Sequence, residues 1–307
     1  MEPSLSIASA KETVAEGESK SFAALLGGLA IVQLGGSFAF PIARYGLGII
    51  EPYTFAFYRF VISAVILLAL VAFRKFKVPV ERKDFFRIVL LGFLIIPFNQ
   101  LTFLVGQSMT AAGHGAFLFS TTPVFIFILA TIHLKEKVNW RRALGIAIAL
   151  AGISIIMFSG AVHVGSDYLL GDLIVLVAVI AWAYYMVLGK PLARKYGALR
   201  VTAYALASGT ALYFPFGLYK AIQFDYSQAN LAAWGSVLYL ALIMSAVVYV
   251  AYYWLLKYMD ASRVAVYQNI QPILATIAAW MFLGEAITST FLVGGAIVLA
   301  GVLTSEL

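Results

Sequence analysis

The stretch Ala261–Gly301, ASRVAVYQNIQPILATIAAWMFLGEAITSTFLVGGAIVLAG, decides the fold. It holds a proline inside an apolar run, a glutamate at the end of that run, and a second apolar run that carries glycines. The same pattern occurs 149 residues earlier, at Ala112–Gly152, and the two 41-residue segments are identical at 13 positions without a gap. The matches include Pro123 with Pro272, Glu136 with Glu285, Gly145 with Gly294, and Gly152 with Gly301. A proline and a glutamate in register indicate an internal duplication, with this pair of segments closing each half.

Composition places the chain in a membrane. Of its residues 63% are hydrophobic and 11% charged, which is more apolar surface than a soluble chain of this size keeps from water. Ten apolar segments follow one another, each near the ~20 residues that a helix needs to cross a bilayer. They cover residues 22–43, 53–73, 85–106, 112–134, 141–159, 169–189, 200–220, 233–256, 262–284 and 287–304. We therefore expect an all-α polytopic membrane protein with ten transmembrane helices.

The distribution of positive charge predicts the orientation. When the tail and the loops are assigned alternately to the two sides, 18 of the 21 Lys and Arg residues fall on one side. Arg44 and Lys220 fall on the other side, and Arg59 lies inside a segment. The positive-inside rule then puts both termini in the cytoplasm. Because each half has five helices, the two halves run in opposite senses, as inverted repeats do.

These segments divide the chain into three parts. Residues 1–21 are polar and lack the basic start and cleavable apolar core of a signal peptide, so we expect a disordered cytoplasmic tail. Residues 22–160 form the first five-helix repeat, and residues 168–307 form the second. The protein is expected in a bacterial cytoplasmic (inner) membrane.

Several motifs resemble a known family. Leu283-Gly284-Glu285, with Pro272 before it and a Gly-rich run after it, is similar to the end of an EamA-type repeat. Gly35-Gly36-Ser37, and Glu51-Pro52 followed by Arg59-Phe60, resemble its start, although Gly35 stands where a Trp is usual. The resemblance covers residues 22–304 and implies the ten-helix branch of the drug/metabolite transporter superfamily. Within it, the chain most resembles the bacterial YddG-type exporters of aromatic and other amino acids.

Polar residues at membrane depth are the candidates for substrate binding. Uncharged amides beside aromatic rings suit a ligand with hydrogen-bonding ends and an apolar or aromatic body. The candidates are Gln33, Ser37, Asn99, Gln100, Trp182, Tyr185, Tyr249, Tyr267, Gln268 and Gln271. They lie on segments one, three, six, eight and nine. Together with segment four, which carries Pro123, these segments are expected to bound a central cavity between the two halves, with segments five and ten outside it. The alternative is that amides join helices and tyrosines form interfacial belts or packing, as for Tyr252 and Tyr253.

Pro123 and Pro272 are candidate hinges. Each sits near the middle of its segment and releases the carbonyl four residues before it, that of Phe119 or Gln268. In lipid such a carbonyl needs a partner, so this backbone should face protein or a wet cavity. The alternative is a packing kink whose carbonyl is satisfied by nearby Ser and Thr side chains.

Charged and titratable groups inside or near the membrane come next. Arg59 is a functional candidate as an intramembrane ion, but snorkelling, or pairing with a carbonyl or Asp172, is the structural alternative. His114 could carry a proton or serve as an interfacial residue. Glu136 and Glu285 are expected to cap the helices that follow them.

Two short hairpin tips are candidate gates. The tip at Gly106–Gly113 is expected outside, and the tip at Lys257–Arg263 inside. Asp260 and Arg263 on the inner tip are available for ion pairs that would hold a gate shut, and the hairpins would move in turn to give alternating access.

Function is narrowed by what the sequence lacks. There is no cysteine, the three histidines show no metal-ligand spacing, and no motif of an intramembrane enzyme lies at membrane depth. We expect no enzyme activity, cofactor, metal or nucleic-acid partner, and the bilayer and a small molecule as partners. A secondary transporter that exports amino acids or similar metabolites fits best. Alternatives are a multidrug, nucleotide-sugar or organophosphate transporter of the same fold, and a non-transporting scaffold.

Overall fold

The computed structural model describes residues 21–74, 76, 78–109, 118–158, 169–283 and 289–306, and it places no strand among them. In the first half, the helices are α2 (Phe22–Leu47), α3 (Pro52–Ala72), α4 (Arg82–Phe93), η1 (Leu94–Phe98), α5 (Asn99–Ser108), α7 (Thr122–Leu134) and α8 (Trp140–Phe158). The chain passes from α4 through η1 into α5 without a loop, and a helical turn at 118–120 precedes α7. Each apolar segment expected in this half is helical over the part that is described, apart from turns at Phe73 and Thr121.

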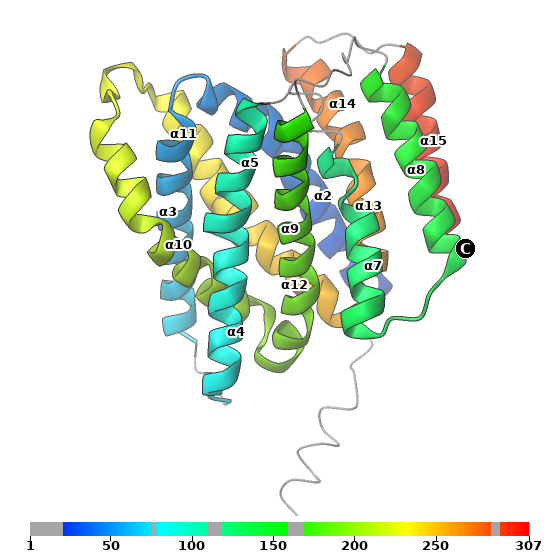
Figure 1. Ribbon diagram of the computed structural model, residues 1–307, viewed down its shortest axis with the longest axis horizontal. Helices are drawn as coiled ribbons and strands as arrows, with labels where there is room; N and C mark the ends of the chain where they lie inside the picture. The colour runs from blue at the N-terminus through cyan, green and yellow to red at the C-terminus, as the bar shows by residue number, and fades with distance from the viewer. Residues whose placement is uncertain are drawn as a thin grey trace, which may run out of the picture.

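The second half has the same plan. Its helices are α9 (Leu169–Tyr196), α10 (Ala198–Gln223), the short η3 (Tyr226–Gln228), α11 (Leu231–Tyr239), η4 (Leu240–Val248), α12 (Tyr249–Tyr258), α13 (Ala261–Tyr267), η5 (Gln268–Ile270), α14 (Gln271–Leu283) and α15 (Ser289–Glu306). Here α11, η4 and α12 form one continuous rod, and so do α13, η5 and α14. The helices stand side by side as one bundle (Figure 1).

Irregular turns interrupt the rods at equivalent places in the two halves. The π-helical turn η1 spans 94–98, and adding the repeat offset of 149 gives 243–247, inside the π-helical η4. A non-α turn at Thr121 likewise corresponds to the end of the 3₁₀ turn η5. Pro97 lies within η1 and could signal this turn in the sequence. No proline lies within η4. The duplication therefore extends to local backbone geometry.

Equivalent helices pack on one another across the molecule. Helix α3 lies against α10, and α8 lies against α15 at one edge of the bundle (Figure 1). A Cβ on Gly145 would lie 2.5 Å from the carbonyl oxygen of Gly301, and one on Gly152 would lie 2.6 Å from that of Gly294. As the residue number rises on α8 it falls on α15, so the two helices run antiparallel, as equivalent helices of inverted repeats must. These glycines allow the close approach of two helices that is typical of membrane proteins.

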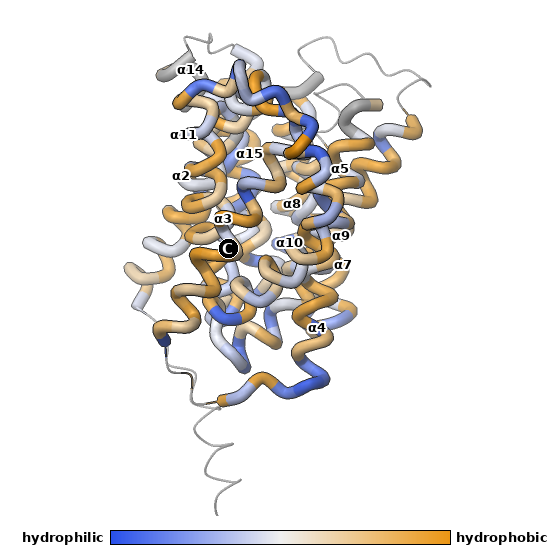
Figure 2. Tube along the Cα trace, turned by 90° about the vertical axis from the view of Figure 1, so that its left-hand side faces the viewer, coloured by the Kyte–Doolittle hydropathy of each residue, from blue (hydrophilic) through white to orange (hydrophobic). Residues whose placement is uncertain are grey.

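The outer faces of the helices are apolar. Within the described residues, five helices are long and apolar enough to cross a membrane, namely Phe22–Leu47, Pro52–Ala72, Arg82–Gly106, Leu169–Tyr196 and Leu231–Tyr258. Leu118–Leu134 and Ser289–Ser305 are shorter apolar helices. Figure 2 shows the change from hydrophilic residues at the start of α4 to hydrophobic residues along it. Large side chains such as Val65 and Ile132, 62% and 63% exposed, point outward. Such a surface is suited to lipid, and the chain is a multi-pass membrane protein.

Candidate functional site

An aromatic cluster joins α9 to α12 in the interior. The ring of Trp182 lies 5.7 Å from that of Tyr185 and 5.4 Å from that of Tyr249. Tyr185 also lies 5.1 Å from Tyr253, whose hydroxyl donates a hydrogen bond of 2.8 Å to the Tyr185 carbonyl. Three of the ten expected substrate-binding residues thus meet in one place. Tyr253 is fully buried, so it is a packing residue and does not belong to an interfacial belt.

Several buried side-chain atoms of α2, α9, α12 and η5 have no hydrogen-bond partner in the part of the chain that is described. They are both amide atoms of Gln33, the hydroxyls of Tyr185 and Tyr252, and the Nδ2 of Asn269. A buried polar group without a partner costs about 1–3 kcal/mol. These groups belong to α2, α9, α12 and η5, and α12 packs on both α2 and α9. Gln33, Tyr185 and Tyr252 thus come from helices that are in contact.

Helix α2 meets α14 through small residues and one amide. The Gln271 Nε2 lies 3.5 Å from the Val32 carbonyl, and the same side chain occupies the space that a Cβ on Gly36 would need. Ser37 donates to the Gln33 carbonyl at 2.5 Å within its own helix. Gln271 is therefore held at the α2 surface beside Gln33, while the Ser37 hydroxyl proton is used locally.

The other expected binding residues are spread more widely. The Asn99 Nδ2 donates to the Ala178 carbonyl at 2.7 Å and so ties α5 to α9. This contact is the interhelical bond that was the alternative for Asn99. Gln100 is half-buried on α5, and Tyr267 packs between two apolar clusters at the end of α13. Gln268 is half-buried in η5, one turn from Gln271.

The two prolines do not lie inside regular helix. Pro123 and Pro272 fall in the first turn of α7 and α14, directly after the breaks described above. The carbonyl of Phe119 accepts the Thr122 hydroxyl, and that of Gln268 accepts the Gln271 N–H in the 3₁₀ turn. Both carbonyls thus have local partners. The Phe119 carbonyl has the Thr side-chain partner given as the alternative, whereas the Gln268 carbonyl is bonded by a backbone N–H. Each proline still marks a point where the rod changes its hydrogen-bond pattern.

Arg59 lies on α3 and reaches the rod formed by α11, η4 and α12. Its Nε donates to the Ser245 Oγ at 2.8 Å, and its Nη2 lies 3.5 Å from the Tyr249 hydroxyl. No carboxylate lies within 4 Å of its guanidinium in the described ranges. Asp172 is in the first turn of α9 and does not pair with it. The expected alternative of an Arg59–Asp172 pair is therefore wrong.

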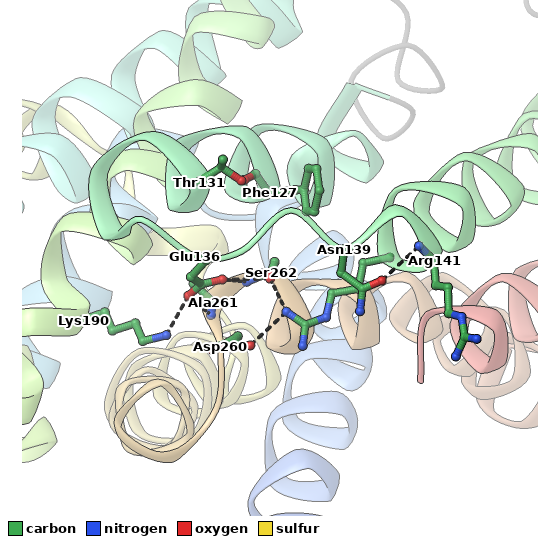
Figure 3. Close-up of polar contacts among 10 residues, drawn as sticks. Phe127, Thr131, Glu136, Asn139, Arg141, Lys190, Asp260, Ala261 and Ser262 are labelled. Atoms are coloured by element: carbon green, nitrogen blue, oxygen red, sulfur yellow. Dashed lines mark hydrogen bonds and ion pairs between the residues drawn. The ribbon is translucent and has the colours of Figure 1, made fainter. Parts of the chain in front are cut away.

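A cluster of polar contacts around Glu136 links the two halves of the chain (Figure 3). This link was not predicted from the sequence. Glu136 accepts the backbone N–H of Ala261 at 2.8 Å and that of Ser262 at 3.2 Å, and the Ser262 hydroxyl at 2.8 Å. It also pairs with Lys190 at 2.7 Å, with only 4% of the Lys190 side chain and 8% of the Glu136 side chain exposed. Glu136 thus caps α13 of the other half. The expectation that it caps the following helix is wrong, because Asn139 accepts the Arg141 N–H there.

The electrostatics of Glu136 follow from these contacts. Burial disfavours the charged carboxylate and is the largest single effect, but Lys190, the Ala261 N–H and the Ser262 hydroxyl together outweigh it. The pKa of Glu136 is therefore lowered, and it is ionised at neutral pH. The first N–H groups of α13 are open to it because Asp260, at the N-cap position, makes no side-chain cap.

Asp260 instead binds Arg142 at the start of α8 in the first half. Its Oδ2 accepts from the Arg142 Nη1 at 2.9 Å, and the same nitrogen donates to the Ser262 Oγ at 2.9 Å. Arg263 is exposed on α13. We call Glu136, Arg142, Lys190, Asp260 and Ser262 the ion-paired cluster. His114, Glu285 and residues 110–113 of the tip at Gly106–Gly113 lie outside the described residues.

Comparisons with known proteins agree with this architecture. The profile of the EamA-like transporter family matches twice, at residues 22–158 and 169–306. An uncharacterized transporter of Archaeoglobus fulgidus is 29% identical over 91% of this chain and 95% of its own length. The uncharacterized transporter YdfC of Bacillus subtilis is 29% identical over 86% of this chain and 85% of its own length. A "Probable terminal-alkyne amino-acid exporter" of Streptantibioticus cattleyicolor is 31% identical over 64% of this chain and 65% of its own length.

A solved structure shows the same fold. A crystal structure superposes with a TM-score of 0.79 at 17% identity and covers 93% of this chain and 98% of its own chain. At this identity the likeness concerns the fold alone.

Proposed function

Because this chain belongs to the EamA-like transporter family, we propose that it is a secondary transporter that exports amino acids or similar small metabolites. The observation that carries the proposal is the aromatic cluster of α9 and α12, which lies beside buried polar groups without partners. An aromatic wall with a few hydrogen-bonding groups is the lining that a small amphiphilic ligand requires. The family is one of transporters, and one relative is named as an amino-acid exporter.

The proposed architecture is ten membrane crossings with both termini in the cytoplasm of a bacterial inner membrane. The charge bias of the loops supports the orientation. The antiparallel packing of α8 on α15 supports an inverted arrangement of repeats at 22–160 and 168–307. On this orientation the ion-paired cluster faces the cytoplasm.

In the proposed mechanism, substrate occupies the space between α2, α9, α12 and α14. Trp182, Tyr185 and Tyr249 contact its body, and Gln33 and Gln271 contact its polar end. The tip of α13 is the inner gate, held shut by Glu136 and by the Asp260–Arg142 pair. It opens by movement about the breaks beside Pro123 and Pro272, which gives alternating access.

The test is uptake by purified protein in liposomes, with a panel of unlabelled amino acids as competitors and with and without a pH gradient. Gln33→Ala, Gln271→Ala and Trp182→Ala should each raise the KM of the best substrate about 10-fold with the folded protein retained. Asn99→Ala is the matched control, because Asn99 bonds backbone and should affect stability more than KM. No competition by any amino acid, or normal KM in all three binding variants, would refute the proposal.

A further inference from the structure

We propose that Arg59 is the binding residue for the carboxylate of the substrate, so that the transporter selects small carboxylates with an apolar or aromatic body. The inference rests on the proposed function and adds to it the chemical group that is recognised. It also assigns a role to Arg59, the only basic residue well inside an apolar segment of the sequence, which the proposed binding site did not use.

The contacts of Arg59 leave most of its N–H donors without a partner among the described residues. A guanidinium has five N–H donors in a planar fork. Ser245 Oγ takes the Nε donor, and the Tyr249 hydroxyl lies near Nη2 at the long distance of 3.5 Å. The Phe60 ring covers one face, with its centroid 4.8 Å from Cζ. Nη1 makes no hydrogen bond in the described residues. The two terminal nitrogens of the guanidinium can therefore donate to both oxygens of one carboxylate.

The charge of Arg59 is not compensated by the described part of the protein. Its partners there are a hydroxyl, a phenol and a ring, all neutral. A cation at membrane depth is costly unless it is paired. A carboxylate that enters the bundle would supply the missing counter-ion, whereas an amine or an uncharged ligand would not. The site therefore favours acids over otherwise identical neutral or cationic molecules.

The direction of the Arg59 side chain contradicts snorkelling toward the near end of α3. The Tyr58 ring lies 4.9 Å from Trp234, and the Ser63 Oγ donates to the Ala241 carbonyl. Residue numbers thus rise together along α3 and the adjacent rod. The partners of Arg59, at 245 and 249, lie beyond that of Ser63. The guanidinium therefore extends along the bundle, away from the start of α3 and toward the aromatic cluster.

Tyr249 connects the two parts of the site. Its hydroxyl is near Arg59, and its ring is 5.4 Å from Trp182 and 6.3 Å from Tyr185. A carboxylate bound by Arg59 would therefore place the rest of the molecule against these rings. Ser245 is presented by the π-helical η4, and π turns occur often at functional sites because they shift side chains out of helical register.

The test compares phenylalanine with phenylalaninamide and phenethylamine as competitors of uptake in liposomes. Wild type should be inhibited by the acid at a concentration at least ~10-fold lower than by the other two. In Arg59→Gln that ratio should fall to about one, through weaker inhibition by the acid alone, whereas Arg59→Lys should keep part of it. Ser245→Ala should reduce the ratio less, because it removes only the contact that orients Nε.

The outcomes separate this inference from the proposed function. A wild-type protein that carries amino acids but does not distinguish acid from amide would overturn the role of Arg59 and leave the transporter intact. If Arg59→Gln does not fold, the ratios of wild type and Ser245→Ala still decide. If no amino acid is carried, the transporter proposal fails, and stabilisation of wild type against heat by carboxylates over their amides tests Arg59 by itself.

Discussion

Two cations inside the helix bundle, Lys190 and Arg59, have different surroundings. Lys190, at the ion-paired cluster, lies 2.7 Å from the carboxylate of Glu136, which also caps α13. Arg59, between α3 and η4, has only neutral partners in the described residues. Both side chains come from helices that pack inside the same bundle. The difference is that Lys190 has a counter-ion within the fold, whereas Arg59 has none among the described residues.

This difference indicates what each cation is for. A buried pair already contains its counter-ion and gains little from a further ligand, and removal of one partner leaves an isolated charge. Lys190 and Glu136 therefore hold the halves together. A cation that lacks a counter-ion is instead ready for an anion from outside, which is the proposed role of Arg59.

The largest expected effect is the loss of Lys190. Lys190→Met should destabilise the protein by about 3–5 kcal/mol, because the buried Glu136 carboxylate loses its counter-ion. Unfolding in detergent micelles measures the free energy. The double variant Glu136→Gln with Lys190→Met is the control, since no charge is then stranded, and it should recover most of the loss. A Lys190→Met protein as stable as wild type would show that the pair does not hold the halves together.

Acid should weaken the same contact. The pKa of Glu136 is lower in the folded protein than in the unfolded chain. Its contribution is therefore fully present above the unfolded pKa, near 4.3, and is lost as the pH falls through the folded pKa. Wild type should lose stability below about pH 4 by more than Glu136→Gln does. Equal acid profiles of the two proteins, measured by thermal unfolding, would contradict this role.

Sequence alone predicted the helical segments and the duplication, because apolar length and a proline–glutamate register are local signals. It listed Trp182, Tyr185 and Tyr249 among ten candidates for substrate binding, and these three lie together in the structure, while their role in binding stays a prediction. It could not predict that Glu136 caps α13, since the partners are 125 residues apart and the dipole rule names no particular helix. The breaks before the prolines were also missed, because a proline removes a bond but does not say what replaces it.

Smaller effects on stability and KM are expected from removing the hydroxyls of Tyr253 and Tyr185. The Tyr253 hydroxyl bonds the Tyr185 carbonyl, whereas the Tyr185 hydroxyl has no described partner. Tyr253→Phe should cost about 1 kcal/mol of stability and leave KM unchanged. Tyr185→Phe should leave stability nearly unchanged and raise KM, if that hydroxyl meets substrate. Uptake and unfolding assays on both variants check this, and a raised KM in Tyr253→Phe alone would reverse the assignment.

The smallest effect is expected at Asp260, the exposed member of the ion-paired cluster. Its side chain is 47% exposed, and Arg142 keeps its bond to Ser262 without it. Asp260→Asn should therefore change stability by less than ~1 kcal/mol, and by less still in high salt.

If α13 is the inner gate, parting its tip from the first half must break the contacts of Glu136 as well. The contacts of Glu136 are buried and include two backbone N–H groups, so they should set the cost of opening. Glu136→Gln should then change the uptake rate more than Asp260→Asn does. The opposite ranking would show that the Asp260–Arg142 pair, and not Glu136, sets the cost of opening.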